Sequence, residues 1–168
     1  YQDADGRYLG MDKKVHRAEP GYVNYSVFSL WDTFRALHPL MTIIQPERAA
    51  NWGKVLVQGY KEGGILPKWP LASSYTGCMV GYPAVSVLAD LATKDLAEGD
   101  LNVWAEAGAR SSVYRDDLAE KFKGTRELDL ITRHPYYKEK YGFVPADSVP
   151  ESVSWGLEMA YYDWCISQ

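Results

Sequence analysis

Apolar residues recur at helical spacing in several separate stretches of the chain. The first stretch, VFSLWDTFRALHP, carries a wide apolar stripe and ends at Pro39, so we expect a helix that stops at this proline. A second helix is expected from Pro46, which suits a first helical turn, to the pair Gly63 and Gly64. The pattern thus predicts two successive helices in this region.

Further helices are expected in the second half of the chain. The third starts near Pro83, and the fourth runs from about Leu101 toward Leu118, with Asp100 as its N-cap. Residues 122–150 are expected to be mostly irregular, apart from a short helical turn around PYYKEKYG.

A last helix opens with Ser148, Pro150 and Glu151, and its apolar positions keep helical spacing from Val153 to Cys165 without a terminating signal. We therefore interpret the chain as a piece of a larger protein. No run of alternating apolar and polar residues is long enough to predict a sheet. The prediction is an all-α fold with long aromatic-rich loops, in which paired helices gather their loops on one face to form a site.

The composition narrows the class of function. A hydrophobic fraction of 46% and a charged fraction of 24% are typical of a globular domain, and a net charge of -4 argues against nucleic-acid binding. No run of about 18 apolar residues is present, so no membrane span is expected. The 6 Trp and 13 Tyr against 4 Phe favour surfaces that stack on ligands with one wet edge, such as sugars.

One loop, LPKWPLASSYTGCMVGYP at residues 66–83, combines aromatic residues, small hydroxyl-bearing residues and prolines. Such a loop between two helices is typical of a binding surface. It contains no carboxylate and no histidine, and its only charge is Lys68. If the loop borders an active site, the acid of that site is missing from it.

Two carboxylates elsewhere have both structural and functional interpretations. Asp32 follows Trp31, and it forms either an exposed ion pair with Arg35, worth a few tenths of a kcal/mol, or a sugar-binding pair with the indole. Glu151 either completes a capping box with Ser148 or projects from the start of the last helix into a site.

Two other polar positions are given plain structural roles. The segment Asp3-Ala-Asp5-Gly6 begins like a calcium-binding loop, but the third acidic position and the closing glutamate are absent, so a tight turn is expected. His134, beside Pro135, is interpreted as a loop residue.

Several blocks of the sequence together resemble glycoside hydrolase family 92, the calcium-dependent exo-α-mannosidases. The blocks are NYSVFSLWDTFRALHPLMTIIQPER, GGILPKWPL, TGCMVGYPAVSVLAD, and YGFVPAD with ESVSWGLEMAYYDWCISQ. They follow in the family's order and cover nearly the whole chain, except mainly residues 94–133.

The resemblance implies the architecture. The family pairs a β-sandwich with an (α/α)6 toroid, so residues 1–168 would be a fragment of a single (α/α)6 catalytic domain, truncated at both ends. The partners implied are the remainder of this catalytic domain and the β-sandwich domain. Secretion or a periplasmic location is also implied, although no signal is visible in the fragment.

The resemblance further implies the removal of terminal mannose from mannose-containing glycans, with inversion and with calcium. Inverting hydrolysis uses two carboxyl groups about 6.5–9.5 Å apart. Trp31, Asp32 and Trp69 match positions that would bind the terminal sugar, and Glu151 matches a glutamate expected to face the sugar or the metal. Most calcium ligands and the general base are expected outside this fragment.

The sequence departs from the family where Ser74-Tyr75-Thr76 stands in place of Asn-Glu-Thr, because that glutamate is the expected general acid. Tyr75 therefore occupies the acid position, although a phenol with a pKa near 10 is a weak donor. Three alternatives follow: a mannosyl phosphodiester hydrolase that needs little protonation, an enzyme using Tyr75 or a neighbouring carboxylate, and a non-catalytic carbohydrate-binding toroid. Many members also carry Asp at the position of Tyr162.

Overall fold

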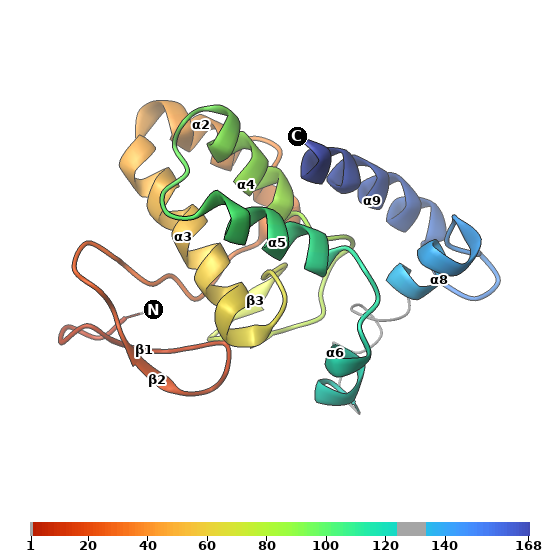
Figure 1. Ribbon diagram of the computed structural model, residues 1–168, viewed down its shortest axis with the longest axis horizontal. Coiled ribbons are helices and arrows are strands. Elements are labelled where there is room, and N and C mark those ends of the chain that lie inside the picture. Colours follow the sequence, from red (N-terminus) through yellow and green to blue (C-terminus); the bar gives the residue numbers. More distant parts are fainter. Residues whose placement is uncertain (1, 124–133) are drawn as a thin grey trace.

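The computed structural model describes residues 2–123 and 134–168 and is rich in helices (Figure 1). Its elements are β1 (Arg7–Leu9), β2 (Val15–Arg17), α1 (Leu30–Thr33), α2 (Leu37–Ile44), α3 (Pro46–Gly63), β3 (Pro70–Leu71), β4 (Ser74–Tyr75), α4 (Ala84–Thr93), α5 (Leu101–Ser111), α6 (Asp116–Lys121), α8 (His134–Tyr141) and α9 (Ser152–Ser167). The strands form only two short antiparallel hairpins, β1–β2 and β3–β4. The helix-rich class predicted from the sequence is confirmed.

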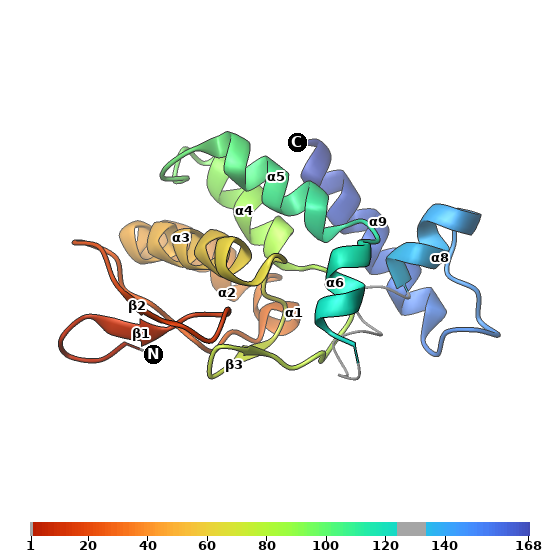
Figure 2. The same ribbon diagram turned by 60° about the horizontal axis from the view of Figure 1, so that its bottom comes forward.

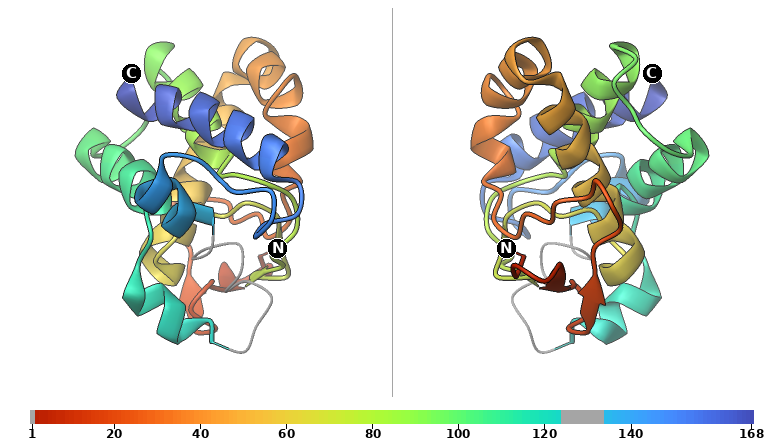
Figure 3. Two further views of the ribbon diagram at one scale, coloured as in Figure 1. Left: turned by 90° about the vertical axis from the view of Figure 1, so that its right-hand side faces the viewer. Right: turned by 90° about the vertical axis from the view of Figure 1, so that its left-hand side faces the viewer.

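The helices pack in two layers with the hairpins on one side. Helix α3 packs against α2, α4 and α5, and α4 and α5 also contact α9. Figure 2 shows α3 between an outer layer of α4 and α5 and the two hairpins on its other side. Figure 3 shows α9 crossing one side of the molecule next to α4. Within the described part of the chain, every helix is too short or too polar to cross a lipid bilayer.

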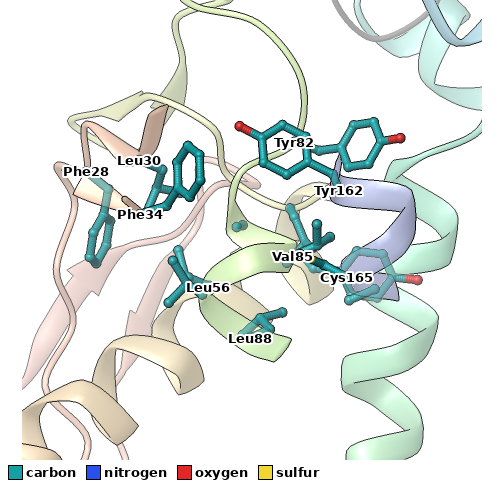
Figure 4. Packing of buried hydrophobic residues seen from close by; sticks show 14 of the residues in the cluster. Phe28, Leu30, Phe34, Leu56, Tyr82, Val85, Leu88, Tyr162 and Cys165 are labelled. Atoms are coloured by element: carbon teal, nitrogen blue, oxygen red, sulfur yellow. The ribbon is translucent and has the colours of Figure 1, made fainter. Parts of the chain in front are cut away.

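The hydrophobic core centres on α4, which packs against α3 and α9. Leu56 of α3 and Leu91 of α4 are almost completely buried, as are Met159 and Tyr162 of α9. Figure 4 shows the rings of Tyr82 and Tyr162 side by side, with centroids 5.3 Å apart. The start of α4 and the middle of α9 are therefore held together by aromatic packing.

The structure corrects the first predicted helix. Instead of one helix that stops at Pro39, α1 ends at Thr33 and α2 continues to Ile44, with Pro39 inside the first turn of α2. A proline is tolerated there, because the first backbone N–H groups of a helix have no partner within it. Pro39 therefore lies at the beginning of a helix and does not end one.

The fourth predicted helix is also shorter than expected. Helix α5 ends at Ser111, and α6 is a separate element. Ser111 donates a hydrogen bond from its hydroxyl to the carbonyl of Ala107 (2.6 Å) and accepts one from the backbone N–H of Leu66 (3.0 Å). The predicted N-cap is confirmed, because Asp100 accepts a hydrogen bond from the N–H of Asn102.

Two other local predictions hold, and one does not. Helix α3 spans Pro46–Gly63, and Gly64 ends it in a left-handed conformation. The backbone N–H of Gly6 donates to the carbonyl of Asp3 (2.9 Å), which is the predicted tight turn. His134 is not a loop residue, because it begins α8 and is buried.

Gly81 lies in a close contact between α9 and the loop that precedes α4. It has a φ of +70°, and a Cβ atom there would lie 2.2 Å from Cε2 of Tyr162. Only glycine fits both the backbone conformation and this space.

We expect Gly81→Ala to lower the thermal stability of the full-length protein. The left-handed backbone alone costs an alanine about 1–2 kcal/mol, and the clash with Tyr162 adds to this. Gly99→Ala is the matched control, because Gly99 also has a positive φ, +98°, but has open space around it. Thermal unfolding followed by circular dichroism should show a larger loss for Gly81→Ala, and equal losses would contradict the proposed packing.

Candidate functional site

The loop singled out in the sequence borders a small cavity. Its walls come from Ile65 just after α3, this loop, the end of α5, the start of α8 and one face of α9. The lining residues include Lys68, Trp69, Tyr75, Tyr82 and Trp155. The cavity encloses about 40 Å³. Ligand pockets usually measure about 300–1,000 Å³, so this cavity holds water molecules or the end of a substituent rather than a whole sugar.

Trp155 is one of the aromatic residues that line the cavity. This buried indole lies on the first turn of α9 and stacks on the ring of His134, with centroids 3.6 Å apart and planes 7° apart. The ammonium group of Lys68 lies 5.0 Å from the centre of the same indole. The sequence showed Lys68 as an isolated charge, but no sequence signal joined it to Trp155, which is distant along the chain.

Lys68 is a cation held in a largely apolar wall. Its Nζ donates a hydrogen bond to the carbonyl of Met79 (2.7 Å). Burial lowers the pKa of Lys68 to about 7, while the nearby thiol of Cys78 opposes this change. The amine and ammonium forms are therefore both accessible near neutral pH.

Tyr75 lines the cavity, but its hydroxyl is directed toward the backbone. The hydroxyl donates to the carbonyl of Ile65 (2.5 Å), and the ring packs edge-on against Phe122 with centroids 5.5 Å apart. A Cβ atom at Gly63 would collide with the Tyr75 hydroxyl oxygen. Burial raises the pKa of Tyr75 above its ordinary value. The phenol proton is thus used to hold the loop against the end of α3.

Trp69 lies beside Tyr75 in the cavity wall and is half-buried. Its backbone carbonyl accepts a hydrogen bond from the hydroxyl of Thr76 (2.7 Å). This bond closes the β3–β4 hairpin and fixes the position of both aromatic residues. The structure therefore brings two of the predicted site residues together.

Trp31 and Asp32 lie on α1 and do not line this cavity. Asp32 accepts a hydrogen bond from the hydroxyl of Ser29. Arg35 pairs with Glu158 of α9 (2.8 Å) and covers the Trp31 ring at 4.9 Å from its centre. The suggested ion pair between Asp32 and Arg35 is therefore wrong, because the arginine is taken by α9, and the carboxylate of Asp32 stays exposed.

Glu151 lies at the N-terminus of α9 and is exposed. The capping box suggested by the sequence is absent, because Glu151 has a left-handed backbone, with φ of 61°, and makes no side-chain cap. The hydroxyl of Ser148 instead donates to the neighbouring Asp147 (3.0 Å). The carboxylate is thus not used by the helix, and it does not line the cavity.

The described part of the chain brings three potential metal ligands together, Asp12, His16 and Glu62, with ligand atoms within 4.8 Å of one another. Calcium prefers six to eight oxygen ligands. Here one of the three groups is the imidazole of His16, which is hydrogen-bonded to Asp12 (2.9 Å). Glu62 already accepts hydrogen bonds from the hydroxyl of Tyr8 (2.8 Å) and the N–H of Met11 (2.9 Å). The cluster does not fit calcium and does not line the cavity.

The comparison with family models places the whole chain in one family. The model of the glycosyl hydrolase family 92 catalytic domain matches residues 1–168. No curated protein sequence matches the chain.

Three solved structures are similar to the chain. A family GH92 α-mannosidase from Bacteroides thetaiotaomicron is 38% identical with a TM-score of 0.82, covering 99% of this chain and 21% of that one. The same mannosidase in complex with mannoimidazole is 39% identical, with a TM-score of 0.81 and coverage of 99% and 20%. A family GH92 inverting mannosidase from the same organism is 32% identical, with a TM-score of 0.80 and coverage of 98% and 21%.

The chain spans about a fifth of the length of these solved relatives, so it corresponds to one segment of them. The family resemblance carried by the sequence blocks is confirmed by both comparisons. The chain belongs to glycosyl hydrolase family 92 and lies within its catalytic domain.

Proposed function

We propose that this chain is part of the catalytic domain of an exo-acting α-mannosidase that releases terminal mannose from glycans. The observation that carries the proposal is the family match over all 168 residues, together with the 38% identity to a GH92 α-mannosidase. Terminal mannose would lie against Trp31, Asp32 and Trp69. The small cavity would then border the glycosidic bond and accept only the nearest part of the leaving group, since it encloses about 40 Å³.

Inversion and calcium dependence belong to the same proposal. One similar structure is of an inverting mannosidase, and inversion requires two carboxyl groups on opposite sides of the sugar. Glu151 is an exposed carboxylate with no structural partner in the cap of α9, which suits a role toward sugar or metal. Because the described residues bring no oxygen-rich cluster together, the calcium ligands would come mostly from the rest of the protein.

The remainder of the protein would complete an (α/α)6 toroid and add a β-sandwich, and we propose a secreted or periplasmic location from the family resemblance. Apolar side chains on two helices support the toroid. Val153, Leu157 and Trp164 are exposed on α9, as are Ile43 and Ile44 on α2. Exposed apolar residues in such numbers usually mark a surface that another segment covers.

We expect the full-length protein, assayed with calcium, to hydrolyse an aryl α-mannoside. Such a substrate has a good leaving group and needs little help from a general acid. Absorbance would follow release of the phenol. NMR would follow release of mannose and identify the anomer that forms first. Mannose binding without any turnover would instead favour the carbohydrate-binding toroid and contradict the enzyme.

Tyr75→Glu should raise turnover of α-1,2-mannobiose by at least about tenfold, because a general acid typically contributes 10²–10⁴-fold. The new carboxyl group would lie beside the Ile65 carbonyl, in a buried site that favours its protonated form. Tyr75→Phe is the control, since it removes the same hydroxyl without adding an acid. No gain for the glutamate variant would mean that Tyr75 does not occupy the acid position or that another group already supplies the proton.

Glu151→Gln should lower turnover of the aryl mannoside by about 10²-fold or more if the carboxylate faces sugar, metal or water in the site. Because the side chain makes no helix cap, stability should change by less than about 0.5 kcal/mol. Steady-state kinetics and thermal unfolding of the full-length protein measure the two effects. Unchanged kinetics would remove Glu151 from the site.

A further inference from the structure

The cavity beside Trp155 lacks the group that glycoside hydrolysis usually takes its proton from. Its lining contains no aspartate and no glutamate from the described part of the chain. The polar side-chain groups on its walls are the ammonium of Lys68, the hydroxyls of Tyr75, Thr76, Tyr82 and Ser111, and the indole N–H groups of Trp69 and Trp155. Among the described residues, a proton donor at this cavity must therefore be one of these groups.

The hydroxyl protons are already directed to acceptors in the protein. Tyr75 donates to the Ile65 carbonyl (2.5 Å), and Ser111 donates to the Ala107 carbonyl (2.6 Å). In the same way, Thr76 donates to the carbonyl of Trp69 (2.7 Å), and Tyr82 donates to the carboxylate of Asp163. Burial also raises the pKa values of both tyrosines, which makes them weaker acids.

Lys68 is the exception. An ammonium group carries three protons, and the structure gives one of them to the carbonyl of Met79 (2.7 Å). The indole of Trp155, 5.0 Å away, attracts the positive charge without accepting a full hydrogen bond. Protons therefore remain for a ligand atom at the cavity wall.

The environment of Lys68, including the titratable groups around it, leaves its pKa near neutral pH. Cys78 lies on its own loop, Tyr75 and Tyr82 line the same cavity, and His134 stacks on Trp155. Burial dominates and lowers the pKa of Lys68 to about 7. A general acid works best when its pKa lies close to the working pH, and lysines tuned to about 7–8 by burial serve this purpose.

We propose that the ammonium group of Lys68 protonates the glycosidic oxygen that leaves the sugar, and so replaces the carboxylic acid missing at Tyr75. The inference rests on the proposed mannosidase function. As the bond between C1 and this oxygen breaks, Lys68 gives up one proton and the departing alcohol is neutral. Water adds to C1 and passes its proton to a base outside the described residues, and solvent returns a proton to Lys68.

The wild-type full-length protein tests this through its pH profile. The acid form exists below the pKa, so kcat/KM for α-1,2-mannobiose should fall as the pH rises through about 7, while an aryl mannoside should show this limb weakly or not at all. A profile for mannobiose that stays flat between pH 6 and about 8.5 would overturn the proposal. If the aryl mannoside is not cleaved either, the mannosidase function fails instead.

Lys68→Met should lower kcat/KM for mannobiose by about 10²–10⁴-fold and lower that for the aryl mannoside far less. Lys140→Met is the matched control, because Lys140 also lies over an aromatic ring, 5.0 Å from the centre of Tyr141, but it is exposed and does not line the cavity. Equal losses on both substrates would indicate a structural role for Lys68 and overturn the proposal.

Two further variants keep the test decisive. Lys68→Arg preserves the charge but does not release a proton near neutral pH, so recovery of mannobiose turnover would assign Lys68 an electrostatic role and reject proton donation. In a Tyr75→Glu background, a carboxylic acid is present, and Lys68→Met should then cost much less than it does alone. Simple additivity of the two changes would also count against the proposal.

Discussion

Contact between α9 and the segment that leads into α4 holds this part of the protein together. Tyr162 is completely buried against Gly81, a residue whose missing side chain leaves the space for the ring. Beside it, Tyr82 donates to Asp163, which pairs with Lys138 of α8 (3.0 Å). Helices α4, α8 and α9 thus meet around one aromatic and charged junction, and the cavity opens next to it.

Tyr162 stands at a position where the family resemblance implies aspartate in many members. Many members are expected to carry aspartate there, but a carboxylate alone at a position with no solvent exposure would be costly. The tyrosine fills the space with its ring, and its hydroxyl reaches Glu158 (2.5 Å), which in turn pairs with Arg35. Tyr162 therefore has partners of its own in α9 and next to α1.

The same requirement, that buried polar groups find partners, decides the chemistry of the cavity. Tyr75, Thr76 and Ser111 all direct their hydroxyl groups to backbone carbonyls, so they stabilise the wall rather than offer protons to a ligand. Lys68 is left with donors beyond those that the backbone uses. Lys68, seven positions from Tyr75 in the same loop, is therefore the group that we propose as the proton donor.

The sequence by itself determined the helix-rich class, the limits of α3 and the Asp100 cap, because these depend on local patterns of apolar and capping residues. It also determined the family, because several blocks of family-like sequence occur in order along the chain. It also marked the loop around Lys68 as unusual. Only the tertiary structure decided that Pro39 begins a helix and that Arg35 pairs with Glu158. It alone placed Lys68 over Trp155. These outcomes depend on which distant elements come into contact, and local spacing carries no information about such contacts.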